Sequence, residues 1–207
     1  MQPSNYIANQ LQVNMRHTNN QIDTPTEEAI TYARWFCKEV ASMGLPMESV
    51  LDAGCRTGYT LPELSKGFGR VTGCDIVPEF VAIAGTRGEA YEGDIHALPF
   101  QDKEFDWTIC TGTLEHCYDT SKAVSELFRV SRIGVFLTAD MQSEEDFKRN
   151  PSHYVRHDTP EEWIDLIRHP DWNLAALEVP SAGYIHGIWL RKPNLKKLSR
   201  GLTWYRS

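Results

Sequence analysis

The sequence predicts an α/β fold in one domain, and three patterns along the chain support this. A buried strand at Ser49–Ala53 runs into a loop with two glycines, and a helix is expected from about Leu61 to Lys66. About twenty residues later, at the spacing of a β-α-β unit, a strand at Arg70–Ile76 precedes a helix that begins with a proline. Near the end of the chain, strands at about residues 174–179 and 183–191 are joined by so short a turn that they must pair antiparallel.

Further elements are expected between these landmarks. A helix begins near Asp23, where a cap, a proline and early acids occur together, and its apolar residues recur at helical intervals up to Gly44. The others are, in chain order, strands at residues 107–111 and 134–139 with a helix from Thr120 between them, and a helix from Thr159 after a polar stretch at residues 140–158.

The chain of 207 residues is long enough for one α/β domain with short additions. Residues 1–24 are polar and rich in Asn and Gln, and we expect a mobile or lid-like segment there. Residues 25–191 are expected to form the α/β domain. Residues 192–207 are expected to form a basic tail, because lysines and arginines but no acids occur at this end of the chain.

The loop after the first strand, at residues 52–58, has the pattern Asp-x-Gly-x-x-x-Gly. It does not match the dinucleotide-binding pattern Gly-x-Gly-x-x-Gly, because Arg56 stands where that pattern needs its second glycine. It also lacks the Gly-Lys-Ser/Thr ending of a phosphate-binding loop. The pattern therefore indicates another small ligand, and an ordinary strand-to-helix turn is the alternative.

Acidic residues follow the next two strands. Asp75 ends the second strand, and its two carboxylate oxygens can accept both hydroxyls of a ribose. The alternative is that Asp75 only caps the helix after it. A third short strand is expected to end in Asp94, and the fourth strand leads into the run Leu114-Glu115-His116.

These motifs, over roughly residues 45–140, resemble those of class I S-adenosylmethionine (SAM)-dependent methyltransferases. The run Leu114-Glu115-His116 is similar to the signature after the fourth strand in the ubiquinone/menaquinone-biosynthesis-like members. The resemblance implies a Rossmann-like sheet of seven strands in the order 3-2-1-4-5-7-6, with strand 7 antiparallel and helices on both faces. It also implies SAM as cofactor and S-adenosylhomocysteine as product.

By this resemblance, the glycine loop passes under the methionine part of SAM, with Asp52 near the amino group and Asp75 on the ribose. Asp94 is available for the adenine amine. The family usually has glycine at the position of Arg56, and an arginine is tolerable there if its side chain points to solvent. The expected cofactor-binding residues are Asp52, Gly54, Cys55, Gly58, Asp75, Ile76, Asp94, Ile95 and Thr111.

His116 is the expected catalytic residue, because it follows the fourth strand closely and a histidine pKa of about 6.5 suits proton abstraction near neutral pH. The alternative is that His116 braces its own loop. His153, Tyr154 and His157 are expected over the acceptor pocket as substrate-binding residues, with a polar surface loop as the alternative. His153 and His157 have the spacing of a metal-binding pair, but no His-Glu-x-x-His motif or third ligand accompanies them, so no metal site is predicted.

Composition excludes several classes of protein. The net charge of −7 argues against a general nucleic-acid binder, and residues 111–114 lack the Asn/Asp-Pro-Pro-Tyr/Phe loop of enzymes that methylate DNA bases.

No apolar run approaches the ~20 residues of a membrane span, and the first residues carry no apolar signal region. An odd number of cysteines, with Cys74 and Cys110 inside strands, indicates reduced thiols. We therefore expect a cytoplasmic protein.

The sequence predicts an enzyme that transfers a methyl group from SAM to oxygen, nitrogen or carbon of a small-molecule acceptor. Two alternatives stay open: a binding module that keeps the fold without the chemistry, and an enzyme that transfers another group from a SAM derivative. The sequence identifies neither the acceptor nor the oligomeric state.

Overall fold

The computed structural model describes residues 6–12, 22–25, 27–141, 144–149, 153–154, 159–178 and 184–192. The strands are β1 (Ser49–Ala53), β2 (Arg70–Asp75), β3 (Glu89–Glu92), β4 (Phe105–Cys110), β5 (Ser131–Asp140), β6 (Trp172–Glu178) and β7 (Tyr184–Arg191). The helices are α2 (Glu27–Met43), α3 (Leu61–Leu64), α4 (Pro78–Ala84), the 3-10 helix η1 (Leu114–His116), α5 (Thr120–Val130), α6 (Glu144–Arg149) and α7 (Pro160–Leu166), and residues 6–12 are also helical. None of the helices in these ranges is long and apolar enough to cross a membrane.

The predicted sheet topology is confirmed. The strands form one sheet in the order β3-β2-β1-β4-β5-β7-β6. The five strands β1 to β5 pair in parallel, and β7 runs antiparallel to both of its neighbours, β5 and β6. Because parallel strands end at the same edge of a sheet, the loops after β1, β2, β3 and β4 lie together there.

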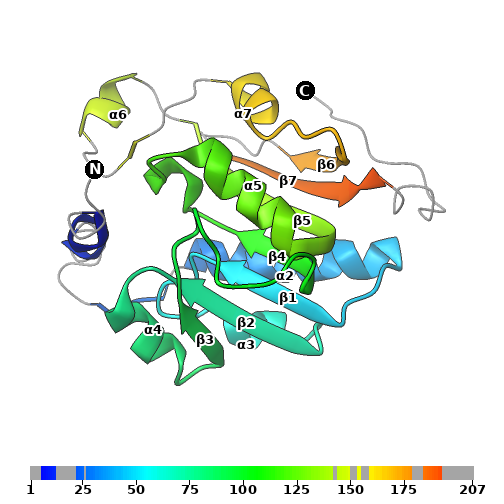
Figure 1. Ribbon diagram of the computed structural model, residues 1–207, viewed down its shortest axis with the longest axis horizontal. Coiled ribbons are helices and arrows are strands. Elements are labelled where there is room, and N and C mark those ends of the chain that lie inside the picture. Colours follow the sequence, from blue (N-terminus) through cyan, green and yellow to red (C-terminus); the bar gives the residue numbers. More distant parts are fainter. Residues whose placement is uncertain are drawn as a thin grey trace.

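Different helices cover the two faces of the sheet, as α2 and α5 do in Figure 1. On one face α2 buries Ala33, Phe36 and Val40, which lie on one side of the helix because they are three and four residues apart. On the other face α5 buries Ala123 and Leu127, again four residues apart. Hydrophobic burial on both faces therefore holds the central parallel strands between two helical layers.

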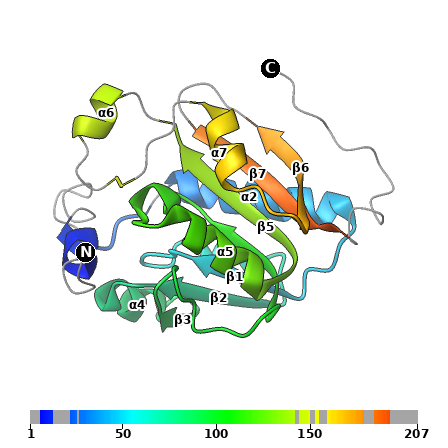
Figure 2. The same cartoon turned by 45° about the horizontal axis from the view of Figure 1, so that its top comes forward.

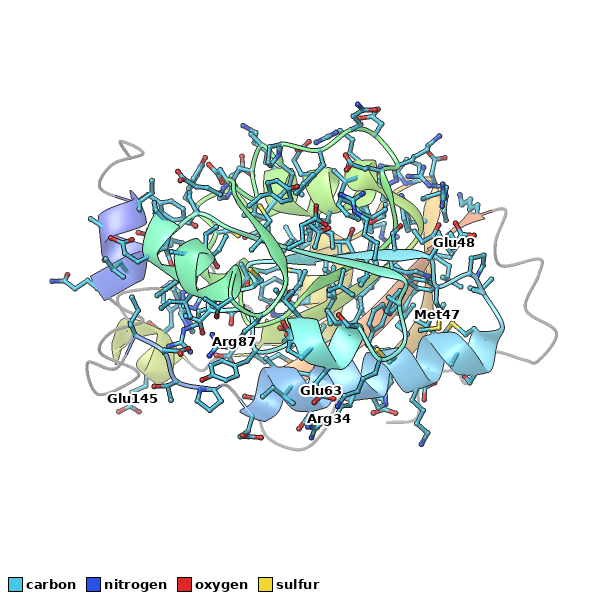
Figure 3. All side chains as sticks on the ribbon, turned by 90° about the horizontal axis from the view of Figure 1, so that it is seen from below. Arg34, Met47, Glu48, Glu63, Arg87 and Glu145 are labelled. Carbon is cyan, nitrogen blue, oxygen red and sulfur yellow. The ribbon has the colours of Figure 1, made fainter. Side chains whose placement is uncertain are left out.

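An ion pair joins α2 to α3 at the surface of one layer. Figure 3 shows Arg34 beside Glu63, and the Nε and Nη2 groups of Arg34 donate to the two carboxylate oxygens of Glu63 at 3.1 Å each. Because 58% of the Arg34 side chain is exposed, water screens this pair and it contributes little to stability. The apolar side chains beneath it contribute most of the attachment of α2.

Local structure departs from the sequence-based prediction in two places. β3 ends at Glu92, two residues before Asp94, because the chain turns at Asp94, where Ala97 donates its N–H to the Asp94 carbonyl oxygen at 2.8 Å. α6 lies in the polar stretch for which the sequence predicted no helix. The mobile or lid-like character of residues 1–24 stays a prediction; within them, residues 6–12 form a helix, which Figures 1 and 2 show beyond the end of the parallel strands.

Gly134 in β5 is expected to be essential for close strand packing. It lies opposite Trp107 in β4, and a Cβ atom at position 134 would overlap the indole ring. We predict that Gly134→Ala lowers the free energy of unfolding by about 1–3 kcal/mol, because overpacking forces the ring or the strand to move. Urea unfolding monitored by circular dichroism measures this change.

The matched control is Gly85→Ala, just after α4, where a Cβ atom would meet nothing closer than 3.4 Å. Its effect should stay below about 1 kcal/mol. Equal unfolding midpoints for the two variants would contradict the proposed constraint at position 134.

Candidate functional site

A cavity of about 420 Å³ opens at the carboxyl edge of the parallel strands. Its wall contains eight of the nine expected cofactor-binding residues: Asp52, Gly54, Cys55, Asp75, Ile76, Asp94, Ile95 and Thr111. The ninth, Gly58, packs instead against α4: its φ is +77°, and a Cβ atom there would lie 2.9 Å from the Cβ atom of Ala84. The structure thus brings together in one wall residues from four successive loops.

Gly54 makes the first turn of the glycine loop possible. Its φ is +80°, and a Cβ atom would overlap the side chain of Thr113, which follows β4. The N–H groups of Gly54 and Cys55 both donate to the carbonyl oxygen of Cys74, at 2.8 and 3.1 Å. These bonds hold the loop close to the end of β2, where only a glycine fits.

Arg56 corrects one expectation from the sequence. Its side chain does not simply point to solvent: Nη1 donates to the carbonyl oxygen of Thr24 at 3.1 Å, and the guanidinium carbon lies 5.7 Å from the centre of the Phe80 ring. The backbone of Arg56 has the left-handed φ of +50° that a glycine adopts more easily. The arginine therefore keeps the loop shape and adds a contact to the segment before α2.

Asp52 lies at the bottom of the cavity and is 1% exposed. The hydroxyl of Thr60 donates a short hydrogen bond to its carboxylate. Burial raises the pKa of Asp52 to about 7; the bond from Thr60 opposes this rise, and the negative charge of Asp75 adds to it. Asp52 can therefore exchange a proton near neutral pH.

Asp75 joins the glycine loop to the next helix. Its carboxylate accepts the backbone N–H of Arg56 at 2.8 Å and that of Val77 at 3.0 Å. Val77 is the N-cap residue of α4, so this bond lies at the start of that helix, and the roles of Asp75 as ribose ligand or as helix cap both stay predictions. Burial raises the pKa of Asp75, and these two backbone bonds oppose the rise. Since each carboxylate oxygen has two lone pairs, Asp75 also keeps acceptor capacity toward the cavity.

Asp94 has a partner that the sequence did not predict. Its Oδ1 atom accepts the backbone N–H of His96 at 2.9 Å and lies 2.6 Å from the Nδ1 atom of the same residue. Burial alone raises the pKa of Asp94, but the bonds from His96 outweigh it and lower the pKa overall. The His96 ring stacks on Tyr118 with centroids 3.8 Å apart. Asp94 is thus an ionised, oriented group on this side of the cavity.

His116 lines the same cavity, at the end of η1. The helix at residues 6–12 holds its backbone: the hydroxyl of Tyr6 donates to the His116 carbonyl oxygen at 3.0 Å, and Nε2 of Gln10 donates to it at 3.3 Å. The His116 ring meets that of His153 edge to face, with centroids 4.7 Å apart. Both candidate roles, in catalysis and in bracing the loop, are compatible with this position.

His153 contacts the His116 ring, but neither His153 nor Tyr154 is part of the cavity wall. Tyr154 donates its backbone N–H to the carbonyl oxygen of Glu115 at 2.8 Å, and its hydroxyl accepts from Asn9 at 2.8 Å. Substrate contact by these two residues stays a prediction. His157, the third expected substrate-binding residue, lies outside the described residues.

Glu115 is a buried carboxyl beside these histidines. Only 5% of it is exposed, and burial raises its pKa to about 7. One ligand atom from each of Glu115, His116 and His153 lies within 4.8 Å of the other two. The sequence does not predict this cluster, because position 153 is almost forty residues from positions 115 and 116 and no spacing motif connects them.

Several residues of the site were missed from the sequence. Tyr6 and Gln10 are both buried and are four residues apart, so they form one side of a helix, which was the available signal in a segment interpreted as mobile. Thr60 and His96 carry no comparable signal, since nothing in the local pattern shows that their partners are the nearby acids.

The sequence of this chain is similar to those of known methyltransferases. Residues 51–139 match the family described as a methyltransferase domain. The chain is 41% identical over 92 residues to a demethylmenaquinone methyltransferase of Roseiflexus castenholzii, covering 41% of this chain and 38% of that protein. It is 35% identical over 151 residues to a probable S-adenosylmethionine-dependent methyltransferase of Mycolicibacterium smegmatis, covering 68% of this chain and 56% of that protein. The chain spans only 28–36% of the length of three further curated relatives.

Among solved structures, the chain is similar to magnesium protoporphyrin IX methyltransferase of Synechocystis PCC 6803 with bound S-adenosylhomocysteine. The TM-score is 0.64 at 15% sequence identity, and the match covers 91% of this chain and 95% of the other. At this identity the likeness concerns the fold.

Asp52 is expected to make stability depend on pH. An unfolded aspartate has a pKa of about 3.9, whereas that of folded Asp52 is about 7, so between these values the folded chain keeps a proton that the unfolded chain has lost. Raising the pH from 5 to 7 should therefore lower the free energy of unfolding by up to about 1.4 kcal/mol per pH unit through this group.

Asp52→Asn should remove that contribution. Between pH 5 and pH 7 its free energy of unfolding should therefore fall less than that of the parent. Urea unfolding at pH 5, 6, 7 and 8 tests this, with Asp165→Asn on the exposed face of α7 as control. The same pH slope for the parent and Asp52→Asn would contradict the raised pKa.

Proposed function

We propose that this chain, which carries a class I S-adenosylmethionine-dependent methyltransferase domain, transfers a methyl group from SAM to a small molecule. The observation that carries the proposal is the convergence of Asp52, Asp75 and Asp94 with the glycine loop on one cavity. Its volume of about 420 Å³ falls within the usual range for small-molecule sites. The methyltransferase-domain match over residues 51–139 supports the same conclusion.

The residues of the cavity fit the chemical parts of SAM. The amino acid part carries an ammonium group, for which the buried carboxylate of Asp52 is a complementary partner. The ribose carries two hydroxyls that can donate to the remaining lone pairs of Asp75. The missing side chain at Gly54 leaves room beside Thr113 for the methionine part. Ile76 and Ile95 add apolar walls for the adenine.

Methyl transfer from SAM requires the protein itself to make or break few covalent bonds. SAM, when bound, supplies a methyl group on a sulfonium, which is already strongly electrophilic. The main task of this chain is to hold the acceptor atom about 3–3.5 Å from that methyl in line with the bond that breaks, and such positioning can supply roughly 7–11 kcal/mol of the barrier. An acceptor that arrives protonated also needs a proton acceptor, and His116 at the cavity wall is the candidate from the sequence.

The proposed acceptor atom is an oxygen, nitrogen or carbon, and the proposed location is the cytoplasm. A binding module without catalysis and transfer of another group are the alternatives. The deciding experiment is calorimetry of SAM binding, followed by measurement of S-adenosylhomocysteine release with pooled metabolite acceptors. Turnover above the rate without protein supports the proposal, binding without turnover favours the module, and no binding rejects both.

Asp75 should carry part of the affinity for SAM. Asp75→Ala removes charge-assisted hydrogen bonds that are typically worth about 1.5–3 kcal/mol, so we expect the Kd for SAM to rise roughly ten- to a hundredfold. Calorimetry measures the Kd. Because Asp75 also bonds at the start of α4, thermal unfolding must show that the variant is folded at the assay temperature.

Asp165→Ala, on the exposed surface of α7, is the control and should bind SAM like the parent. If folded Asp75→Ala keeps its SAM affinity within a factor of two, Asp75 acts only on α4 and the glycine loop.

A further inference from the structure

A cluster of Glu115, His116 and His153 lies next to the proposed cofactor cavity. Glu115 and His116 are neighbours in η1, and His153 comes from a segment almost forty residues later. One ligand atom from each residue, a carboxylate oxygen or an imidazole nitrogen, lies within 4.8 Å of the other two. A metal ion is a common reason for two histidines and a carboxylate to meet in this way.

The carboxylate of Glu115 gives independent support. It is 95% buried, since its exposed fraction is 5%, and its Oε2 atom has no hydrogen-bond partner among the described residues. The backbone N–H of Glu115 itself bonds to the carboxyl group, whereas the charged groups that influence it among the described residues, Asp140 and Glu28, are both acidic. A buried carboxylate with one oxygen unsatisfied and no cation nearby is costly, and a bound cation would compensate it.

The two segments that carry the cluster are bonded to each other. Tyr154 donates its backbone N–H to the carbonyl oxygen of Glu115 at 2.8 Å, which keeps His153 beside η1. Tyr6 donates to the carbonyl oxygen of His116 at 3.0 Å and also contacts the Tyr154 ring, with centroids 5.9 Å apart. This framework is independent of any ion, so the three side chains are held together beforehand.

We propose that Glu115, His116 and His153 bind one divalent transition-metal ion of the Zn²⁺ class. Imidazole nitrogens together with one carboxylate oxygen suit zinc and neighbouring metals, whereas Mg²⁺ and Ca²⁺ prefer oxygen ligands. Metal–ligand bonds of about 2.0–2.2 Å place the ligand atoms of a tetrahedral ion about 3.3 Å apart. The present separations within 4.8 Å require only small side-chain rotations to reach this geometry.

The position of the proposed ion indicates that it can bind the methyl acceptor. His116 lines the cavity, whereas Glu115 and His153 are not part of its wall, so the ion sits at the cavity edge. Three protein ligands leave a coordination position open, which is typical of catalytic rather than structural zinc. If the proposed methyl transfer holds, an oxygen or nitrogen of the acceptor can occupy that position. The imidazole nitrogen that binds the ion has no lone pair left to accept a proton. In this arrangement His116 therefore orients the ion and does not itself take the proton of the acceptor.

Metal titration of the full chain tests the site without any need for SAM. The protein is purified with a tag free of histidine, treated with a chelator and dialysed. Zn²⁺ binding is measured by calorimetry, and Co²⁺ binding by its visible absorption bands. We expect one equivalent of either ion per chain. Glu115→Gln and His153→Ala should each weaken binding by on the order of a hundredfold or more, because each removes a direct ligand.

His169→Ala is the matched control, since His169 lies against Phe128 and takes no part in the cluster. It should bind the ion like the parent. Circular dichroism melting checks that each variant is folded, and His153→Ala keeps the test valid if the buried Glu115→Gln does not fold. A parent that binds less than a tenth of an equivalent, or folded cluster variants that bind like the parent, overturns the proposal.

Failure of this proposal and failure of the proposed function are separable. Calorimetry with SAM, on the same chelated protein, reports the cofactor site by itself. SAM binding without metal binding rejects the metal site and leaves the methyltransferase function intact. Metal binding without SAM binding supports the metal site and rejects the proposed function.

Discussion

The candidate site depends above all on one buried carboxylate, that of Asp75. It accepts the N–H of Arg56 from the loop after β1 and the N–H of Val77 at the start of α4. The first bond stabilises a left-handed turn at a residue that is not glycine, and the second fixes where the next helix begins. The wall of the cavity therefore takes its shape from an acid that also faces into it, so structure and ligand recognition are coupled at this residue.

The charge of the cavity follows from the same arrangement. Asp52, Asp75, Asp94 and Glu28 all line it, and Arg56 is the only lysine or arginine among the described lining residues. Burial raises the pKa of Asp52 and Asp75, which means that a cation entering the cavity would interact with groups that are poorly solvated. A ligand with an ammonium and a sulfonium group, such as SAM, complements this field.

The side of the cavity that carries His116 is assembled from distant parts of the chain. The helix at residues 6–12 and the segment with Tyr154 both bond to the backbone of η1, at His116 and Glu115 respectively. Two separate segments thus hold a short loop that carries a buried acid and a histidine. One of these contacts joins residues 110 positions apart in the sequence, so the position of η1 depends on tertiary structure.

The order of the strands in the sheet followed from the family resemblance. The sequence by itself determined the positions of most strands along the chain, the glycine loop and the acids at or near the strand ends. Each of these depends on local patterns: apolar runs of strand length, glycines where φ is positive, and carboxylates placed directly after a strand. Only the tertiary structure decided that Arg56 turns toward Thr24, that Asp94 is paired with His96, and that Glu115 and His116 meet His153. The contacts of Arg56 and of the Glu115 cluster join residues far apart along the chain, and the pairing of Asp94 depends on how its loop is packed. Their geometry is set by packing of the sheet edge and its loops, on which the local spacing of residues carries no information.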